Sequence, residues 1–117
     1  MRLRSAVTVF IPLALAACGG GSEDSPILYK SAGSLQCAAS QTAQVHLNAE
    51  VAALHAGGVS VVSSGCANDG VGHPAACGTN NGDLFAVSVS PGSVAAAQQL
   101  GHQSASALPN AKSIACQ

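Results

Sequence analysis

The segment 41–63, QTAQVHLNAEVAALHAGGVSVVS, combines a helical hydrophobic pattern with a run of β-branched residues. Apolar residues recur at steps of three or four in its first part, and this spacing predicts an amphipathic helix over 41–56. Gly57-Gly58 ends the helix, because glycine adopts the left-handed conformation of a helix terminus at low cost. Residues 59–63 then predict a strand, since β-branched side chains suit a pleated surface. The apolar helix positions are Ala43, Leu47, Val51 and Leu54.

A second unit follows in which a helix is again ended by a glycine and followed by a strand. Alternating apolar residues predict a strand over 84–89, and Ser90-Pro91 predicts the start of a helix, since proline suits a first helical position. Gly101 ends that helix, and residues 102–108 predict a weak final strand before a tail over 109–117. The residues expected to face the core are Phe85, Val87, Val89, Val94, Ala97 and either Leu100 or Ala96.

Two further segments complete the expected order of elements. Residues 27–30 predict a first strand after Pro26, and residues 65–83 predict a long loop with two turn signals. The order strand, helix, strand, strand, helix, strand resembles that of the ferredoxin-like βαββαβ sandwich. The resemblance implies a small α+β fold with two helices on one face of an antiparallel sheet. It implies no function, because an order of elements alone carries none.

The composition limits the classes of function. The chain has 117 residues, of which 48% are hydrophobic and 8% are charged, so we expect one small folded domain and no extensive disorder. Four Lys and Arg residues against five Asp and Glu residues cannot form a basic surface for nucleic acid. One Tyr, two Phe and no Trp provide little surface for stacking on bases or sugars. We therefore expect no nucleic-acid partner.

The N-terminal segment has the pattern of an export signal. Arg2 and Arg4 provide a positive start, and residues 6–17 form an apolar stretch that is too short to span a membrane. Its end, Leu15-Ala16-Ala17-Cys18, resembles the lipobox of bacterial lipoproteins. The resemblance implies a diacylglycerol on the Cys18 thiol, cleavage before Cys18, and a further acyl chain, such as palmitate, on the new amino group.

This resemblance sets the expected domain boundaries and the location. Residues 1–17 would be the signal peptide, residues 18–26 an acylated cysteine with a flexible tether, and residues 27–117 the single α+β domain. Each buried acyl methylene contributes about 0.8 kcal/mol, so two or three chains hold a protein firmly on a bilayer. Gly19 stands where inner-membrane lipoproteins carry an aspartate, which implies the outer membrane with the domain facing the periplasm.

The other four cysteines predict two disulfides. An even number of cysteines in a short exported chain is typical of a disulfide framework. A core made largely of Ala, Val and Leu also needs covalent support at this size. Three pairings are possible; we favour Cys66–Cys77, which closes a short loop, with Cys37–Cys116 joining the tail to the front of the domain. In a ferredoxin-like sheet the second pair requires the tail or the segment 31–40 to double back.

The expected function is a non-catalytic binding or interaction module. We expect the sheet face away from the helices to be semi-apolar and open to a periplasmic partner or to a second copy, unless the tail or the segment 31–40 covers it. The loop 65–83 is the other candidate surface, because long clamped loops often carry function. The sheet residues expected to face away are Leu28, Val62, Leu84 and Ala86, and those expected to face the helices are Tyr29, Phe85, Val87, Val59 and Val61.

The alternative is a periplasmic metal-binding lipoprotein. His73 lies between Cys66 and Cys77, and all three are possible zinc or copper ligands. However, their spacing matches no zinc knuckle or finger, and no methionine follows the predicted cleavage site, so we expect no metal and no cofactor.

We also expect no enzyme, because no nucleophile motif and no carboxylate pair stands out. The possible carboxylates are Glu50, Asp69 and Asp83, and the remaining histidines, His46, His55 and His102, suit exposed helix positions or a helix end.

Replacement of the acylation site tests the export prediction. In Cys18→Ser the hydroxyl cannot form the thioether, so we expect the variant to lose fatty-acid labelling and to accumulate at precursor size. Metabolic labelling with palmitate and membrane fractionation measure both effects. If neither form is labelled and both sediment with membranes at full size, the lipoprotein prediction is wrong.

Overall fold

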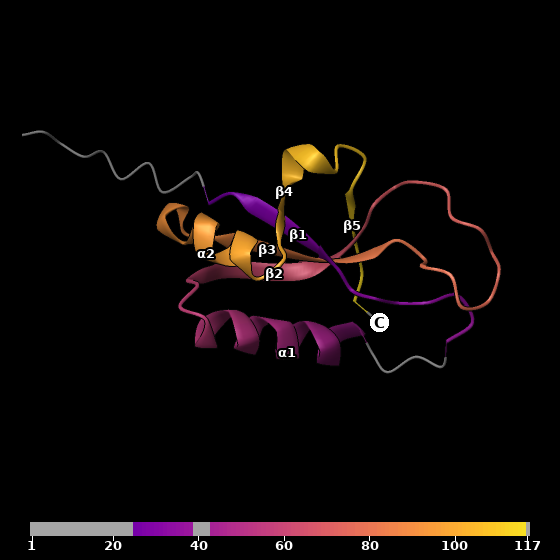
Figure 1. Ribbon diagram of the computed structural model, residues 1–117, viewed down its shortest axis with the longest axis horizontal. Helices are drawn as coiled ribbons and strands as arrows, with labels where there is room; N and C mark the ends of the chain where they lie inside the picture. The colour runs from indigo at the N-terminus through magenta and orange to yellow at the C-terminus, as the bar shows by residue number, and fades with distance from the viewer. Residues whose placement is uncertain (1–24, 39–42, 117) are drawn as a thin grey trace, which may run out of the picture.

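The computed structural model describes residues 25–38 and 43–116 (Figure 1). The predicted signal peptide 1–17, Cys18 and the tether up to residue 24 lie outside the described residues, as does the predicted start of the first helix. In chain order the elements are β1 (Ile27–Ser31), α1 (Ala43–Ala56), β2 (Val61–Asn68), β3 (Asp83–Val89), the 3₁₀ turn η1 (Pro91–Ser93), α2 (Val94–Gln99), β4 (Gln103–Ser104), the 3₁₀ turn η2 (Ala105–Ala107) and β5 (Lys112–Ile114).

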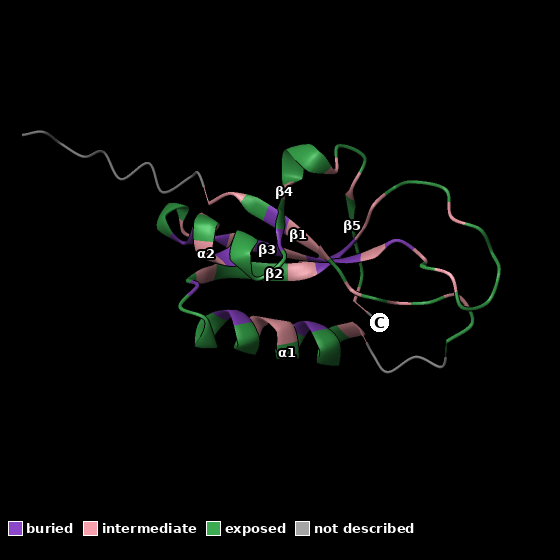
Figure 2. Ribbon diagram, in the orientation of Figure 1, coloured by how far each residue is buried: buried purple, intermediate pink, exposed green. Residues whose placement is uncertain are grey.

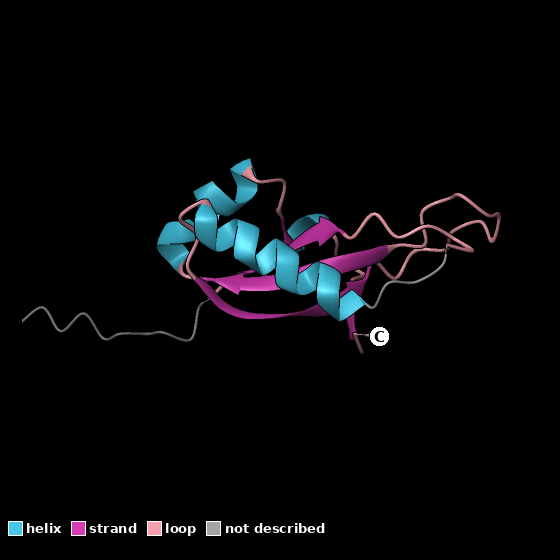
Figure 3. Cartoon of the chain, turned by 90° about the horizontal axis from the view of Figure 1, so that it is seen from below, coloured by secondary structure: helices cyan, strands magenta, loops and turns pink. Residues whose placement is uncertain are grey.

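The strands form one antiparallel sheet with the order β4-β1-β3-β2-β5. Leu54 of α1 and Ala97 of α2 pack in one buried cluster with Val87 of β3, so both helices cover the same sheet face. In the view from below, α1 lies across this face (Figure 3). The predicted α+β class, with two helices against an antiparallel sheet, is therefore confirmed.

The core follows the periodicities of the sequence. Alternation along β3 places Phe85, Val87 and Val89 toward the helices, and all three are buried as predicted. Leu47 and Leu54 are two helical turns apart and present the buried stripe of α1. Figure 2 shows this buried layer between α1 and the sheet. One cluster consists of Leu28, Leu54, Val59, Val87, Val89 and Ala97, and the other of Leu47, Cys66 and Phe85.

The second strand differs from its predicted bounds. We expected it over 59–63, but β2 begins at Val61 and continues to Asn68, into the predicted loop. Cys66 pairs with Phe85 of β3 on one side and with Ile114 of β5 on the other. Backbone hydrogen bonds on both sides thus hold a segment whose glycine and asparagine are typical of turns, and this tertiary context overrides the local propensity.

The expected faces of the first strand are wrong. Leu28 pairs with Val87 and is only 1% exposed, so it lies in the core, whereas Tyr29 pairs with Ala86 on the outer face. The stretch Ile27-Leu28-Tyr29 lacks polar alternation, and an error of one residue moves every side chain of a strand to the opposite face.

Two other predicted outer-face residues, Val62 and Leu84, differ in exposure. Val62 is 60% exposed at an irregularity between Val61 and Ser63, while Leu84 faces away from the helices but is only 6% exposed.

The C-terminal segment crosses the sheet face on which Leu84 lies. β4 contains only two residues of the predicted strand 102–108, and β5 lies in the predicted tail. Because β4 and β5 occupy opposite edges of the sheet, the chain between them crosses the face that the helices leave free. Figure 1 shows η2 on the opposite side of the sheet from α1. The outer face is thus partly covered by its own chain, the alternative that the sequence left open.

Two disulfides are present, as predicted, but the favoured pairing is wrong. Cys37 bonds to Cys77, and Cys66 bonds to Cys116, with Cα–Cα distances of 5.1 and 5.3 Å. Cys66 opposes Ile114 in the sheet, so Cys116, two residues further along, lies on the same face and within reach. The preference for a short loop failed because strand pairing, which is non-local, brings these cysteines together.

Neighbouring alanine substitutions in β1 test the assignment of the two faces. Leu28→Ala should lower the free energy of unfolding by about 2–5 kcal/mol because it leaves a cavity in the core. Ile27→Ala, at a position that is 45% exposed, should cost about 1 kcal/mol or less. Chemical denaturation of both variants measures the difference, and a larger effect at Ile27 would contradict the observed faces.

Candidate functional site

The most distinctive surface feature is a projection that we call the finger, consisting of residues 32–38 and 69–82. Its two segments leave the sheet where β1 ends and where β3 begins, and they form the loops that extend to the right in Figure 1. The amide of Ala32 donates to the carbonyl of Asp83 (2.9 Å), and that of Gln36 donates to Thr79 (2.7 Å). Leu35 and Asn80 form a β-bridge between these bonds. The finger therefore continues the pairing of β1 with β3.

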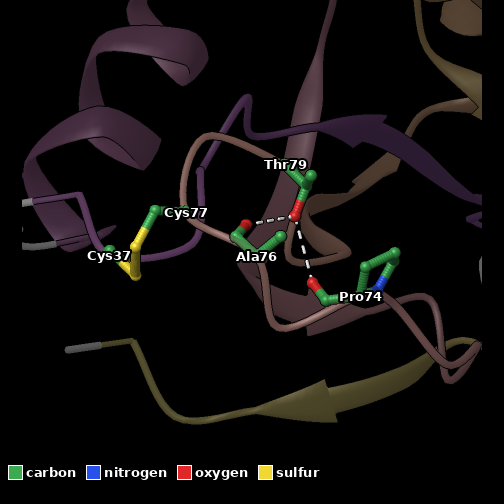
Figure 4. The surroundings of a disulfide bond; sticks show 5 residues. All are labelled: Cys37, Pro74, Ala76, Cys77 and Thr79. Carbon is green, nitrogen blue, oxygen red and sulfur yellow. Dashed lines mark hydrogen bonds between the residues drawn. A yellow bond between two sulfur atoms is a disulfide. The ribbon is translucent and has the colours of Figure 1, made fainter.

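A disulfide clamps the middle of the finger. The Cys37–Cys77 bond joins the two segments beside a turn in which the Thr79 hydroxyl donates to the carbonyls of Pro74 (3.0 Å) and Ala76 (2.6 Å) (Figure 4). Cys37 has a backbone φ of +62°, a conformation that residues other than glycine rarely adopt. The crosslink and the turn together restrict a region that has no hydrophobic core of its own.

An acid–histidine pair closes the base of the finger. Nε2 of His73 lies 2.7 Å from Oδ2 of Asp69, while Oδ1 of Asp69 accepts from the amide of Val71 at 3.0 Å. The Val71 amide, the largest influence, and His73 lower the pKa of Asp69 against a smaller opposing effect of burial. Gly82 has a φ of +85°, and a Cβ there would lie 2.6 Å from the side chains of Asp69 and His73, so a larger residue would be strained and would displace the pair. The pair and this contact fix the loop to the start of β3.

The finger presents a nearly uncharged surface. Its segments contain no Lys or Arg, and Asp69, already paired with His73, is its only carboxylate. Leu35 and Val71 expose 45% and 54% of their surfaces. The centres of protein interfaces are depleted in charged residues, and the finger shares this low charge.

The finger lies at the end of the sheet away from the predicted tether. Ser25 lies two residues before the start of β1, whereas the finger begins after the last residue of β1, Ser31. A domain held through residues before Ser25 therefore presents the finger at its other end.

A cleft of about 620 Å³ lies beside the base of the finger. Its walls include Leu35, His46, Phe85 and Ile114, and they also include Ala38 and Ala43. The segment 39–42, which joins the last two residues, lies outside the described residues, so we assign no ligand to this cleft.

A partly buried charged group joins α1 to the sheet. Oε1 of Glu50 accepts from Nζ of Lys30 at 2.9 Å and lies 3.0 Å from Nε2 of His102, which is 2% exposed. Burial, the largest influence, raises the pKa of Glu50, but the hydrogen bonds and charges of Lys30 and His102 together outweigh it and lower the pKa. The group joins β1, α1 and the segment before β4, so its role is structural.

The position of Glu50 in the sequence already signals this group, although we did not predict it. Glu50 comes three residues after Leu47 and four before Leu54, so it lies on the buried stripe of α1 and requires a partner there. His102, which was expected at a helix end, lies there but is buried, whereas His46 and His55 are exposed as expected.

The remaining candidate residues are not brought together. Cys66 and Cys77 form disulfides with different partners, so these sulfurs are not free to bind a metal with His73. Among residues 25–38 and 43–116, no group of three or more His, Cys, Asp or Glu side chains could hold a metal ion. Glu50, Asp69 and Asp83 each contact different neighbours, namely Lys30 and His102, His73, and Asn68.

Comparisons with known proteins find no match: neither a family model, nor a curated protein, nor a solved structure is similar to this chain. In the part of the chain that the structure describes, no helix has the length and apolarity needed to cross a bilayer.

Replacement of the central carboxylate tests the charged group. The Glu50 pKa is lower in the folded than in the unfolded chain, so the ionised group stabilises the fold above the unfolded value, and this contribution disappears as the pH falls through the folded-state pKa. Glu50→Gln should reduce stability by about 1–3 kcal/mol at neutral pH, with a smaller difference below the ordinary value of 4.5. Thermal denaturation across this range measures it, and a difference that does not change with pH would contradict the assignment.

Proposed function

We propose that the chain is the precursor of a cell-envelope lipoprotein whose domain is a non-catalytic binding module. The export pattern and the cysteine at the end of Leu15-Ala16-Ala17-Cys18 support acylation at Cys18 and an outer-membrane location facing the periplasm. The disulfide-clamped, nearly uncharged finger, at the end of the sheet away from Ser25, is the observation that carries the binding proposal. The partner that fits it is a periplasmic protein.

The length of β1 separates the finger from the predicted membrane anchor. An extended strand advances about 3.3 Å per residue, so the five residues of β1 alone separate its start from the finger by roughly 15 Å. A partner that contacts the finger therefore approaches from the side away from the predicted anchor, and the membrane does not obstruct it.

The rigidity of the finger supports recognition. Binding by a flexible loop costs conformational entropy for every residue that becomes ordered, whereas a pre-organised loop has met this cost on folding. The Cys37–Cys77 bond, the turn around Thr79 and the Asp69–His73 pair each restrict the finger before any partner arrives.

The candidate carboxylates favour binding over catalysis. Each of Glu50, Asp69 and Asp83 is engaged with a separate set of neighbours, and a paired-carboxylate mechanism needs two such groups on one substrate. The sheet face around Val62 and Ala86, which the sequence predicts as a contact surface, is the alternative to the finger, whereas Leu28 and Leu84 are buried.

We also propose that the domain is a ferredoxin-like sandwich with an added strand. The order β1-α1-β2-β3-α2-β4 and the central position of β1 and β3 support this arrangement. β5 is the addition, on the edge beside β2.

Site-specific photocrosslinking tests the binding surface. A benzophenone side chain at Val71, in the finger, should give a discrete adduct with one envelope protein in cells that produce the acylated protein. The same group at Val62, where exposure is similar, should give none. Denaturing electrophoresis detects the adducts, and mass spectrometry identifies them.

A substitution in the neighbouring finger segment tests whether the adduct reflects specific binding. Leu35→Ser should reduce the Val71 adduct about fivefold or more, because it removes an apolar contact. Leu100→Ser, at an exposed position on the C-terminal side of α2, serves as the control and should leave the yield unchanged. An adduct from Val62 alone would move the binding surface to the sheet and overturn the finger as its site.

A further inference from the structure

The two disulfides lie in opposite environments. Cys37 and Cys77 are both exposed. Cys66 is 6% exposed, and Cys116 packs beside it against the core cluster of Leu47 and Phe85. A thiolate must reach a sulfur atom to attack a disulfide. Cys116 is half-buried and Cys66 is buried, so solvent thiols reach the first bond more readily than the second.

We propose that Cys37–Cys77 is a site of thiol–disulfide exchange, reduced by an external dithiol, while Cys66–Cys116 is a permanent structural crosslink. The thiolate of the reductant attacks one sulfur, forms a mixed disulfide and releases the other cysteine as a thiolate, which takes up a proton. The second thiol of the reductant then attacks the mixed disulfide and releases the remaining cysteine. The protein gains two electrons and two protons, and the reductant leaves as its own disulfide.

The surroundings identify this pair as a substrate of a reductase and not as a reductase itself. Dithiol oxidoreductases activate the attacking cysteine with a Cys-X-X-Cys motif, a nearby cation or a helix N-terminus. Here the cysteines are 40 residues apart, and the finger contains no Lys or Arg. Its one histidine, His73, is engaged with Asp69.

Reduction changes the finger and leaves the core intact. Without the crosslink, Cys37 is no longer held at a φ of +62°, a conformation that costs energy for any residue with a side chain. Backbone hydrogen bonds such as Gln36 to Thr79 and Gly78 to Gln36 then hold the two segments alone. No residue of the main core cluster lies in the finger. The Cys37–Cys77 bond therefore determines how rigid the finger is, whether or not a partner is bound.

Partial reduction of the folded protein tests the difference between the two bonds. The mature acylated protein in detergent micelles is treated with dithiothreitol without denaturant, alkylated at intervals and mapped by mass spectrometry. Cys37 and Cys77 should be alkylated at least about tenfold faster than Cys66 and Cys116. Equal rates, or faster labelling of Cys66 and Cys116, would overturn the proposal.

Hydrogen exchange tests the consequence for the finger. In the selectively reduced protein, and in the double variant C37S/C77S, the amides of Gln36, Gly78 and Asn81 should exchange at least about tenfold faster than in the oxidised protein. The amides of Val59 and Val89, which bond to Leu54 and Pro26, should keep their rates.

The matched variant C66S/C116S separates this effect from a general loss of crosslinking. It should raise exchange at the core amides of Val59 and Val89, because it removes the crosslink that holds the edge strand β5 to β2 beside the core cluster of Leu47 and Phe85. If C37S/C77S instead accelerates the core amides as much as C66S/C116S does, the exposed bond is structural and the proposal fails.

Discussion

The crosslink between Cys66 and Cys116 is the constraint on which the arrangement of the sheet depends. It joins the end of the chain to β2 on the helix-covered face, beside the pairing of Cys66 with Ile114. With β5 held at one edge and β4 paired to β1 at the other, the chain between them must cross the outer face. A strand of only three residues could not hold that path by its own hydrogen bonds. Closing a 50-residue loop contributes about 4 kcal/mol on the chain-entropy model, a large part of the roughly 5–15 kcal/mol that typically stabilises a domain.

The local elements were predictable because their signals are local. Helix α1 follows from apolar residues spaced three or four apart, and strand β3 from apolar residues spaced two apart. The end of α1 at Gly57 is likewise predicted from adjacent residues alone. β5 and the second half of β2 had no such signal. Their residues are small or polar, and they form strands because each lies beside another strand. The disulfide pairing failed for the same reason, since it depends on which strands become neighbours.

The candidate site was predictable in part. The long loop before β3 was identified as a candidate surface, but its partner segment, residues 32–38, was expected only as a connection. A two-segment finger becomes visible only when Leu35 meets Asn80, which is far along the chain. Glu50 shows the opposite case, because its position between Leu47 and Leu54 on the helix already required a buried partner. What no sequence pattern supplied was the identity of those partners, Lys30 and His102.

The domain divides its stabilising interactions between two regions with different requirements. Under the helices, apolar side chains and the Cys66–Cys116 bond form the core, and Glu50 accepts from Lys30 and lies 3.0 Å from His102. Among the described residues, Nδ1 of His102 is buried without a hydrogen-bond partner. The finger has no apolar interior, so its order rests on polar turns and on one exposed disulfide. Interactions open to solvent are weaker and more responsive to the chemical environment than buried ones. A change in redox conditions that leaves the core unaffected can therefore act on the surface that we propose for recognition, because the two regions share a sheet but not a crosslink.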